Sequence, residues 1–520
     1  MVVGDILTHN NMRFPDKLGL VDERLRLTWG QVNGRVNRLA NAMLGLGVKK
    51  GDRVAILSEN CVPFAEILFA VAKLGVIGVG LNYRLTSKQL QSVIADCTPK
   101  AIFVENRFDH IIKDIQSQMD SVELIVGLGP SHHCPYDYET LQAQYPSNEL
   151  TIQVEEQDIF ILLYTSGTTG APKAVPITHK ARVIESLLLA TVYRCSSNDV
   201  AMLGPALFAN GGQTLFFNYC AMGMGIVVVP FVGKIVAELC EKEKVTCMTV
   251  VPIRYQIIRD YLNTCSQTYD LSSITKVLIG AAQPCPYDKL KEIMEFFGVS
   301  YSLQTYGMTE TAGPAICLLP EEVAAGMRPD ATWKERQRIN SVGKPLLGLQ
   351  VRVVDEADND VPAGQVGEIL LKGDTVMSGY WKKLELNQQV LRGGWYHTSD
   401  LGMLDEDGYL YFVGRKDFQI HTGGIFVTPA EVEDVIARHP AVNEVAVIGL
   451  PSERWGEEVT AIVVPKEGAV VSEAMIEDHC RKTLAGFQVP KHVYFRNDLP
   501  KHPEYGRIQV KELQRIYQKK

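Results

Sequence analysis

One short stretch of the chain, YTSGTTGAPKAV at residues 164–175, carries the side chains that a polyphosphate requires. Hydroxyl groups and unhindered backbone N–H groups donate hydrogen bonds to anionic oxygens, and a lysine supplies positive charge. The stretch does not follow the P-loop pattern G-x-x-x-x-G-K-S/T, because Gly167 and Gly170 are too close together and Ala174 follows Lys173. It therefore indicates an anion site of another design.

The segments on either side of this loop predict its setting. The apolar run from Asp158 to Tyr164 predicts a buried strand, and THKARVIESLLLA predicts a helix with Thr178 as its N-cap. A strand, a glycine-rich loop and a helix are a common setting for bound phosphate. Composition alone leaves a second interpretation open, in which the loop is a flexible surface turn.

A second motif, YGMTETAG at residues 306–313, has groups that suit a nucleotide. Tyr306 can stack on a base, and the Thr309 hydroxyl can bond a phosphate oxygen. The Glu310 carboxylate is a ligand of the kind that Mg²⁺ prefers. Taken alone, Glu310 has a plainer interpretation as a carboxylate at the start of a helix.

A third motif, WYHTSDLG at residues 395–402, places Asp400 where a carboxylate can accept hydrogen bonds from two ribose hydroxyls. A fourth, GRKD, brings Arg415 close to Asp417. Each motif also has a structural interpretation, because Asp400 fits an Asx turn and GRKD fits a surface ion pair.

The pattern of apolar residues predicts the elements that position these motifs. From residue 28 onward, helical periods alternate with short β-branched runs such as RVAIL and AIFVE, which is typical of parallel sheets covered by helices. A second cycle follows the glycine-rich loop, with predicted strands in GIVVVP, VTCMTVVP and KVLIGAA. Short strands and turns from about 341 to 413 predict a small β-rich unit, and a compact mixture of helix and strands follows Gly414.

Length, charge and cysteine usage exclude several classes of protein. A chain of 520 residues is too long for one hydrophobic core. The net charge of -8 argues against a general nucleic-acid or membrane-surface binder. The 11 cysteines include no C-x-x-C pair, which disfavours a disulfide framework and fits a reducing cytosol. With no secretory signal and no apolar stretch of bilayer length, we expect a cytoplasmic protein without a membrane span.

Together, in this order and at these spacings, the four motifs closely resemble the adenylate-forming superfamily of acyl-CoA synthetases, nonribosomal adenylation domains and luciferases. The resemblance covers nearly the whole chain and includes GKPLLGLQVRVVD, GEILLKGDTVMSGYW and TPAEVEDVIARHPAVNEV. It implies an α/β fold whose large N-terminal domain, residues 1–413, contains two doubly wound α/β subdomains and a small β-barrel. A small, mobile α+β C-terminal domain, residues 414–520, is implied to follow.

The resemblance also implies a two-step reaction. A carboxylate attacks the α-phosphorus of ATP, giving an acyl-adenylate and pyrophosphate, and a thiol then displaces AMP. The first step brings an anion up to a polyanion, so it needs cations in the transition state. The implied cofactors and partners are ATP, Mg²⁺, coenzyme A and a small-molecule carboxylic acid, without nucleic acid.

By resemblance, residues of this sequence take separate roles. The catalytic residues would be Lys173, Thr309, Glu310 and Arg507, with Glu310 also holding Mg²⁺. The phosphates would be held by Thr165, Ser166, Gly167, Thr168, Thr169 and Gly170. The nucleoside would contact Gly280, Ala281, Ala282, Thr305, Tyr306, Asp400 and Arg415. The acid would contact Phe208, Ala209, Asn210, Gly211 and Gln213, the thiol step would use Gly423 and Gly424, and Asp417 would be the hinge.

The sequence departs from the family's pattern in its last loop. Members normally carry P-x-x-x-x-G-K, whose lysine contacts the acyl carboxylate and phosphate during adenylation. Here LPKHPEYGRIQVKEL has Arg507 at that position and is one residue longer. A planar guanidinium does not occupy the site of a compact ammonium. Either Arg507 or Lys501 takes over the contact, or the chain adenylates poorly.

Two further departures concern the substrates. Where many members have an aromatic–His pair in the acyl tunnel, this chain has Phe208, Ala209 and Asn210. Ile425 and Phe426 stand where members commonly carry Glu-Asn. We expect an acid:CoA ligase for a small to medium acid, aliphatic or aryl. Two alternatives stay open, an enzyme that loads a carrier protein and a nucleotide-binding homologue with weak adenylation; a homodimer is also left open.

Overall fold

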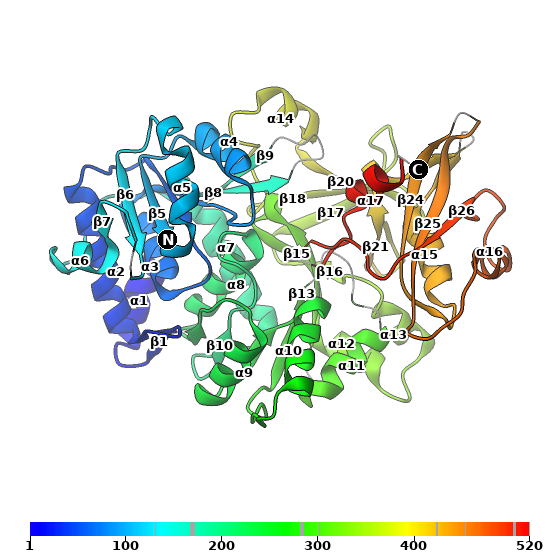
Figure 1. Cartoon of the computed structure of the whole chain (residues 1–520), viewed down its shortest axis with the longest axis horizontal. Coiled ribbons are helices and arrows are strands. Elements are labelled where there is room, and N and C mark those ends of the chain that lie inside the picture. Colours follow the sequence, from blue (N-terminus) through cyan, green and yellow to red (C-terminus); the bar gives the residue numbers. More distant parts are fainter. Residues whose placement is uncertain are drawn as a thin grey trace. The chain divides into compact units, whose positions relative to one another are not determined.

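The computed structural model has two compact units, which we call unit 1 (Met1–Gln350 and Lys372–Tyr396) and unit 2 (Val351–Leu371 and His397–Lys520). Figure 1 labels many of their helices and strands. The structure describes residues 1–520 apart from Ser131, 167–171, 281–284, Pro286, Tyr301, 423–424, Glu453, 503–505 and 519–520. It also leaves undescribed the side chains of Ser166, Pro172, Asp417, Ile425 and Phe426.

The first sheet of unit 1 has seven strands in the order β7-β6-β5-β3-β4-β8-β9. They are β3 (Arg53–Leu57), β4 (Ile77–Gly80), β5 (Ala101–Glu105), β6 (Leu124–Leu128), β7 (Tyr136–Asp137), β8 (Ile159–Ser166) and β9 (Pro172–Thr178). Neighbouring strands are parallel except β8 and β9, which are antiparallel. Central strands such as β3 and β5 read as continuous apolar runs because parallel sheets are covered on both faces.

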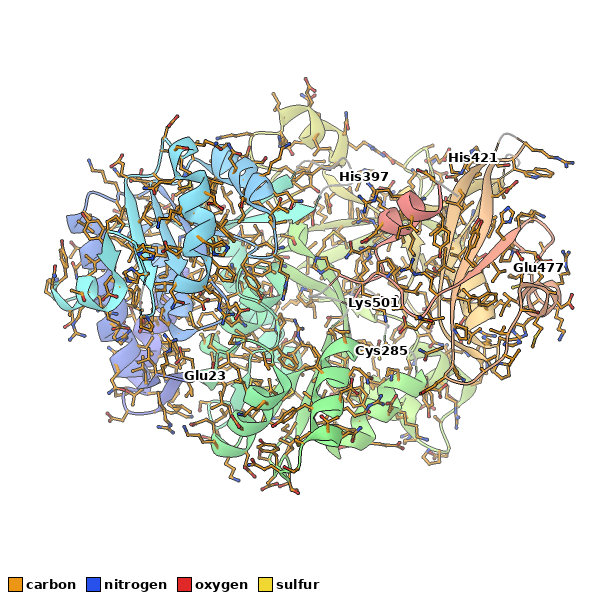
Figure 2. All side chains as sticks on the ribbon, viewed as in Figure 1. Glu23, Cys285, His397, His421, Glu477 and Lys501 are labelled. Carbon is orange, nitrogen blue, oxygen red and sulfur yellow. The ribbon has the colours of Figure 1, made fainter. Side chains whose placement is uncertain are left out.

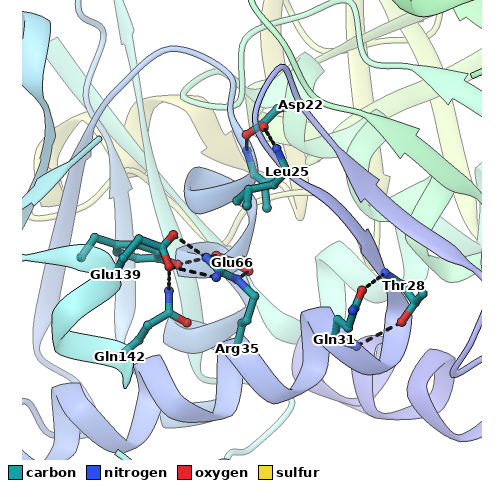
Figure 3. A network of polar contacts seen from close by, with 10 residues as sticks. Asp22, Leu25, Thr28, Gln31, Arg35, Glu66, Glu139 and Gln142 are labelled. Atoms are coloured by element: carbon teal, nitrogen blue, oxygen red, sulfur yellow. Dashed lines mark hydrogen bonds and ion pairs between the residues drawn. The ribbon is translucent and has the colours of Figure 1, made fainter. Parts of the chain in front are cut away.

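Polar side chains join the helices that accompany this sheet. These helices are α1 (Val3–Arg13), α2 (Trp29–Gly45), α3 (Val62–Leu74), α4 (Ser87–Cys97), α5 (Asp109–Ile115) and α6 (Tyr138–Ala143). Arg35 of α2 contacts Glu66 of α3 and Glu139 of α6 (Figure 3). The Tyr138 hydroxyl donates to Glu66 at 2.6 Å. Glu66 is fully buried, so these partners offset the cost of removing its carboxylate from water.

The second sheet of unit 1 has nine strands in the order β16-β15-β14-β13-β12-β10-β11-β1-β2. They are β1 (Leu18–Val21), β2 (Arg26–Thr28), β10 (Val200–Met202), β11 (Gly225–Val227), β12 (Cys247–Thr249), β13 (Lys276–Gly280), β14 (Gln304–Met308), β15 (Gly313–Leu318) and β16 (Lys344–Pro345). The strands from β14 to β1 are parallel, and antiparallel strands flank them at both ends.

Seven helices accompany this sheet among the described residues: α7 (His179–Tyr193), α8 (Asn210–Ala221), α9 (Gly233–Lys242), α10 (Pro252–Thr264), α11 (Tyr287–Phe297), α12 (Pro320–Met327) and α13 (Trp333–Arg338). Helix α7 begins where the sequence predicts, with Thr178 as a cap that accepts a hydrogen bond from the Ala181 N–H. Phe69 of α3 packs against Phe216 and Phe217 of α8, so one aromatic core joins both halves of unit 1.

Two smaller sheets follow. One has the order β17-β18-β20-β19, with β21 beside β20: β17 (Leu349–Val354), β18 (Val366–Gly373), β19 (Leu391–Arg392), β20 (Trp395–Leu404) and β21 (Leu410–Arg415), with α14 (Leu384–Val390). The other has the order β23-β22-β25-β24, with β26 beside β25: β22 (Ile420–Thr422), β23 (Ile425–Val427), β24 (Val442–Ser452), β25 (Gly456–Pro465) and β26 (His492–Phe495).

Three helices cover the last sheet: α15 (Pro429–Ala437), α16 (Glu473–Arg481) and α17 (Val510–Tyr517). Successive residues of β24 point to opposite faces of the sheet. Val445 and Val447 pack with α15 and α16, whereas Ala446 and Ile448 pack with α17. This part of unit 2 therefore has two small hydrophobic cores, one on each face of its sheet.

The α/β fold with two sheet cycles and a smaller C-terminal part is confirmed. The residues predicted to form a small β-barrel make the five-stranded sheet of β17 to β21, whose described strand pairings form an open sheet. The predicted boundary at 413/414 concerns domains that move and stays a prediction, while the observed unit 2 also includes Val351–Leu371 and the chain from His397. In the described part of the chain, no helix combines the length and apolar character needed to cross a membrane.

Candidate active site

Lys173 lies on a strand and not at the start of a helix. Strand β9 stands between the glycine-rich loop and α7, so the loop joins two antiparallel strands. Thr165 pairs with Lys173 across this hairpin, and the Thr165 hydroxyl donates to the Lys173 carbonyl at 3.4 Å. The predicted order of strand, loop and helix was wrong because PKAVPIT, an apolar β-branched run, extends the sheet before the chain turns into α7.

A tyrosine that the sequence analysis did not single out lies between Lys173 and Glu310. The Tyr380 hydroxyl donates to Glu310 Oε1 at 2.7 Å. The Lys173 Nζ lies 5.5 Å from the centre of the Tyr380 ring, in cation–π range. The structure thus brings together two predicted catalytic residues from distant motifs. Tyr380 is in the motif GEILLKGDTVMSGYW, but nothing in the spacing indicates this contact.

Glu310 occupies a tight turn between β14 and β15. It is in η3 (Thr309–Thr311), a single 3-10 turn, so its interpretation as a helix-start carboxylate loses its physical basis. The Thr311 hydroxyl accepts from the Met308 N–H at 3.0 Å and donates to the Gly313 carbonyl at 2.6 Å, which fixes the turn. Thr309 is half-buried, as is Thr305 on β14.

Tyr306, predicted to stack on adenine, has 4% of its surface exposed. Adenine stacking therefore stays a prediction.

A buried arginine, which the sequence analysis also missed, connects this turn to the predicted acyl segment. Arg182 of α7 is fully buried and donates to the Ala312 carbonyl at 2.8 Å and to Asn210 Oδ1 at 2.8 Å. Asn210 in turn donates to the Met308 carbonyl at 3.3 Å. Both sides of the turn are therefore tied to the start of α8. The one signal in the sequence is an arginine on the apolar face of a predicted helix.

Arg182 has a carboxylate neighbour on its own helix. Glu185 Oε2 accepts from Arg182 at 3.3 Å, and burial raises the pKa of Glu185 to about 8 although Arg182 acts in the opposite direction. A side chain at Gly313 would clash here, since a Cβ there would lie 2.3 Å from Glu185 Oε1. The glycine of TETAG therefore has a packing reason.

The residues predicted to contact the acid lie close together in the chain, but their side chains have different packing and hydrogen-bond partners. Phe208 is 8% exposed, and its ring meets Tyr83 edge to face with 5.3 Å between centres. The Arg84 guanidinium carbon lies 5.8 Å from the centre of the Phe208 ring. Gln213 is fully buried and donates to the Leu207 carbonyl at 2.9 Å. Ala209 caps α8, and Gly211 is in its first turn.

In unit 2, Asp400 and Arg415 lie opposite each other on β20 and β21, with Arg415 Nε 3.1 Å from Asp400 Oδ1. The residue before Asp400, Ser399, has a left-handed backbone with φ of 59°. Its N–H donates to Glu368 at 3.1 Å, which holds the turn that presents Asp400.

Arg507 belongs to the same group of charges. Its guanidinium carbon lies 5.9 Å from the centre of the Phe418 ring. Burial and the positive charge of Arg415 lower the pKa of Arg507, while Asp400 acts in the opposite direction. The Arg507 side chain is exposed. Its guanidinium therefore lies near the positive charge of Arg415 and still contacts solvent.

Lys501, the alternative cation, has a different partner. Its Nζ contacts Glu444 of β24 at 2.6 Å. Figure 2 labels Lys501 among the side chains. A backbone bridge joins Lys501 to Ile508. The geometry therefore favours Arg507 over Lys501 as the neighbour of Asp400 and Arg415.

Several predicted residues lie outside the described part of the chain. They are Gly167, Thr168, Thr169, Gly170, Ala281, Ala282, Gly423 and Gly424. For Ser166 and Asp417 only the backbone is described, and Gly280 ends β13. Asp417, the predicted hinge residue, falls in η4 (Lys416–Phe418), inside unit 2. Their roles stay predictions.

Comparison with known families places most of the chain in one of them. Residues 7–381 match the family described as AMP-binding enzyme. Residues 431–504 match the family described as AMP-binding enzyme C-terminal domain.

Individual proteins are similar over nearly the full length. A feruloyl-CoA synthase of Amycolatopsis sp is 32% identical, with 91% of each chain covered. An indoleacetate–CoA ligase of Aromatoleum aromaticum is 30% identical, covering 98% of this chain and 95% of that protein. A crystal structure of the anthranilate CoA ligase AuaEII with anthranoyl-AMP has a TM-score of 0.86 and 29% identity, covering 99% of this chain and 97% of that one. The chain therefore belongs to the AMP-binding enzyme family, in its branch of acyl- and aryl-CoA synthetases.

Proposed function

We propose that this protein is an ATP-dependent carboxylic acid:CoA ligase. In the first half-reaction, an oxygen of the acid attacks the α-phosphorus of ATP, the bond to the β-phosphate breaks, and pyrophosphate leaves. In the second, the sulfur of CoA attacks the acyl carbon and AMP leaves. Membership of the acyl- and aryl-CoA synthetase branch supports this chemistry.

The observation that carries the proposal is the meeting of Lys173 and Glu310 at Tyr380. A lysine over the ring and a carboxylate at the hydroxyl of one tyrosine suit a metal-bound polyphosphate, because the lysine can neutralise phosphate oxygens while the carboxylate holds the cation. Lys173 and the hydroxyls of the glycine-rich loop would stabilise the pyrophosphate as it leaves.

The residues present fit Mg²⁺ bound together with the nucleotide. Glu310 uses one oxygen to accept from Tyr380 and keeps lone pairs for a metal. In the described ranges, no group of three or more His, Cys, Asp or Glu side chains forms a complete metal cage. One carboxylate, with phosphate oxygens and water as the other ligands, suits Mg²⁺. The bound ion would neutralise phosphate charge during the first half-reaction.

The other charges of the site would act on the nucleoside and on the acid. Thr309 would contact the α-phosphate. Asp400 and Arg415 would bind the ribose, and Arg507 would screen the carboxylate and α-phosphate as they approach each other. Between the half-reactions the C-terminal domain would rotate about Asp417, taking Arg507 away and bringing Gly423 and Gly424 to the thiol.

Two other functions remain as alternatives, an enzyme that loads a carrier protein and a nucleotide-binding homologue with weak adenylation. The second is motivated by Arg507 in place of the usual lysine. Against it, Arg507 already contributes to the charges around Asp400 and Arg415. A cytoplasmic location and a homodimer stay predictions.

One assay separates the three functions. Pyrophosphate release is measured with a panel of carboxylic acids, each with and without CoA, and the acyl product is identified by mass spectrometry. Aryl acids enter the panel first, since the relatives described above are named for ferulic, indoleacetic and anthranilic acids. Acid-dependent pyrophosphate release with a CoA thioester as product supports the ligase. Release without any thioester favours a carrier protein as acceptor, and nucleotide binding without release favours the weak homologue.

A further inference from the structure

The segment of residues 377–381, which we call the strap, contacts both predicted phosphate-binding motifs through its backbone. The Met377 N–H donates to the Glu310 carbonyl at 2.7 Å. The Trp381 N–H donates to the carbonyl of Ala174, the residue after Lys173, at 2.9 Å. One short loop therefore fixes the main chain at the two places that carry the predicted catalytic charges.

Tyr380 repeats this connection with its side chain. Its hydroxyl donates to Glu310, and its ring faces the Lys173 ammonium. The residue is 8% exposed, and its hydroxyl lies 3.5 Å from that of Tyr396. A buried ring with two such contacts has few other orientations available, so it limits the positions of both charged groups.

The strap is itself anchored. The Tyr380 N–H donates to Asn387 Oδ1 at 2.7 Å, and the Asn387 amide returns a hydrogen bond to the Tyr380 carbonyl at 3.0 Å. Asn387 belongs to α14, which follows the strap in the chain. The paired bonds fix the backbone from which the ring projects, so Tyr380 is positioned by a second element and not by chance packing.

We propose that Tyr380 is a positioning residue that sets the separation of Lys173 and Glu310 for a metal-bound polyphosphate. Its two contacts act on different parts of the ligand. The hydroxyl orients the Glu310 carboxylate toward the cation, while the ring supports Lys173 against the phosphates. Direct contact with the ligand is not required for this role. The inference rests on the proposed function, since it assumes that Lys173 and Glu310 bind phosphate and Mg²⁺.

Two substitutions separate the two contacts. Tyr380→Phe removes the hydroxyl and keeps the ring beneath Lys173, whereas Tyr380→Leu removes both. A hydrogen bond to a charged group corresponds to about a tenfold change or more in an equilibrium constant. For Tyr380→Phe we therefore expect the dissociation constant of α,β-methylene-ATP, measured by calorimetry, to rise about tenfold with Mg²⁺ and to change little when EDTA replaces Mg²⁺. Tyr380→Leu should weaken binding in both conditions.

Tyr138→Phe is the matched control. It removes another tyrosine-to-carboxylate hydrogen bond of unit 1, the 2.6 Å bond from Tyr138 to Glu66, away from both phosphate motifs. It should lower the thermal stability without changing nucleotide affinity. In steady-state assays, Tyr380→Phe should raise the Michaelis constant for ATP and the half-saturating Mg²⁺ concentration while leaving that for the acid unchanged.

Three outcomes decide between the hypotheses. The positioning role is overturned if Tyr380→Phe weakens binding of the ATP analogue equally with and without Mg²⁺, or does not weaken it at all. So does a loss of thermal stability with normal nucleotide affinity, which makes Tyr380 a packing residue. If Lys173→Met and Glu310→Gln leave adenylation intact, the proposed nucleotide site itself fails; if they abolish adenylation while Tyr380→Phe binds like the wild type, only this inference fails.

Discussion

The two units each gather a small group of charges, but they do so in different ways. In unit 1, Lys173 and Glu310 are separated by the neutral side chain of Tyr380, which contacts both. In unit 2, Asp400 pairs with Arg415, and Arg507 adds a second positive charge beside them. The first group is balanced and held by a neutral residue, whereas the second has a surplus of positive charge.

This difference indicates what each group is suited to do. A balanced group on anchored elements can hold a phosphate and its metal in one geometry throughout the reaction. A crowded pair of guanidinium groups repels itself and becomes favourable when an anion arrives between them. Under the proposed function, unit 1 would therefore carry the chemistry and the selection of the acid, and unit 2 would control when the cationic contact is made.

The largest expected effect is the loss of either charge from unit 1. Lys173→Met and Glu310→Gln should each slow pyrophosphate release about a thousandfold, or about 4 kcal/mol of transition-state stabilisation, because each removes a charge that we propose acts on the phosphates or their metal. Lys180→Met is a control for the loss of a lysine, since Lys180 pairs with Asp374 at 2.9 Å at the start of α7. Normal rates in both unit 1 variants would remove these residues from the site.

The next effect concerns the pH dependence of the free energy of unfolding, which should have opposite signs in the two units. His179 of unit 1 is fully buried and accepts from the Val3 N–H at 3.2 Å. Burial lowers the pKa of His179 from 6.5 to about 4, against the opposing charges of Asp158 and Asp5. The contribution of neutral His179 to the free energy of unfolding is complete above pH 6.5. It is lost as the pH falls toward 4, which amounts to about 3 kcal/mol in all.

Glu433 of unit 2 acts in the other direction. Burial raises the pKa of Glu433 from 4.5 to about 7, although the Val447 N–H donates to it. Its contribution is complete below pH 4.5 and is lost as the pH rises through 7. Hydrogen exchange, corrected for intrinsic rates, should show unit 1 opening first on acidification. His179→Asn, which keeps an acceptor for Val3, should abolish that order, and an unchanged order would exclude His179 as the cause.

A smaller effect is expected from the surplus charge of unit 2. Arg507→Ala should slow adenylation about 30-fold, or about 2 kcal/mol, and spare thioester formation from a preformed acyl-adenylate. It should not destabilise unit 2, because Arg415 loses a like-charged neighbour. This combination distinguishes Arg507 from an ordinary structural residue.

Lys501→Ala is the matched change. It removes a cation from the same loop but breaks the contact with Glu444 instead. We expect normal adenylation and a small loss of stability. A defect confined to Lys501→Ala would transfer the role of Arg507 to Lys501.

The sequence predicts the α/β class well because that class depends on local signals. Apolar runs identify strands such as β8 and β13, and the Thr178 cap fixes the start of α7. Strand β9 was missed because PKAVPIT contains two prolines and a lysine, which weaken its pattern as a strand.

The residues that connect the motifs could not be predicted in the same way. Tyr380 and Arg182 act across the fold, since the contact from Tyr380 to Glu310 spans 70 residues of sequence and that from Arg182 to Ala312 spans 130. Nothing in their local pattern separates them from ordinary core residues. A sequence therefore identifies the groups that carry charge more readily than the groups that hold those charges in place.

The smallest expected effect tests whether unit 1 alone selects the acid. Phe208→Ala should favour acids that are bulkier by a methyl group or two, with a change in relative kcat/KM of about 1 kcal/mol per methylene, because the space of the lost ring becomes available. The Michaelis constant for ATP should not change, since none of the described contacts of Phe208 involves Lys173, Glu310 or Tyr380.

Phe297→Ala of α11 is a suitable control because Phe297 is also an 8% exposed phenylalanine of unit 1. Both substitutions remove packing and should lower stability, so stability alone cannot separate them. Only Phe208→Ala should alter the order in which acids are used. If both variants change that order equally, selection depends on the general looseness of unit 1. If neither variant changes that order, the acid binds elsewhere. The proposal that unit 1 selects the acid while unit 2 controls the timing of its activation then fails in its first part.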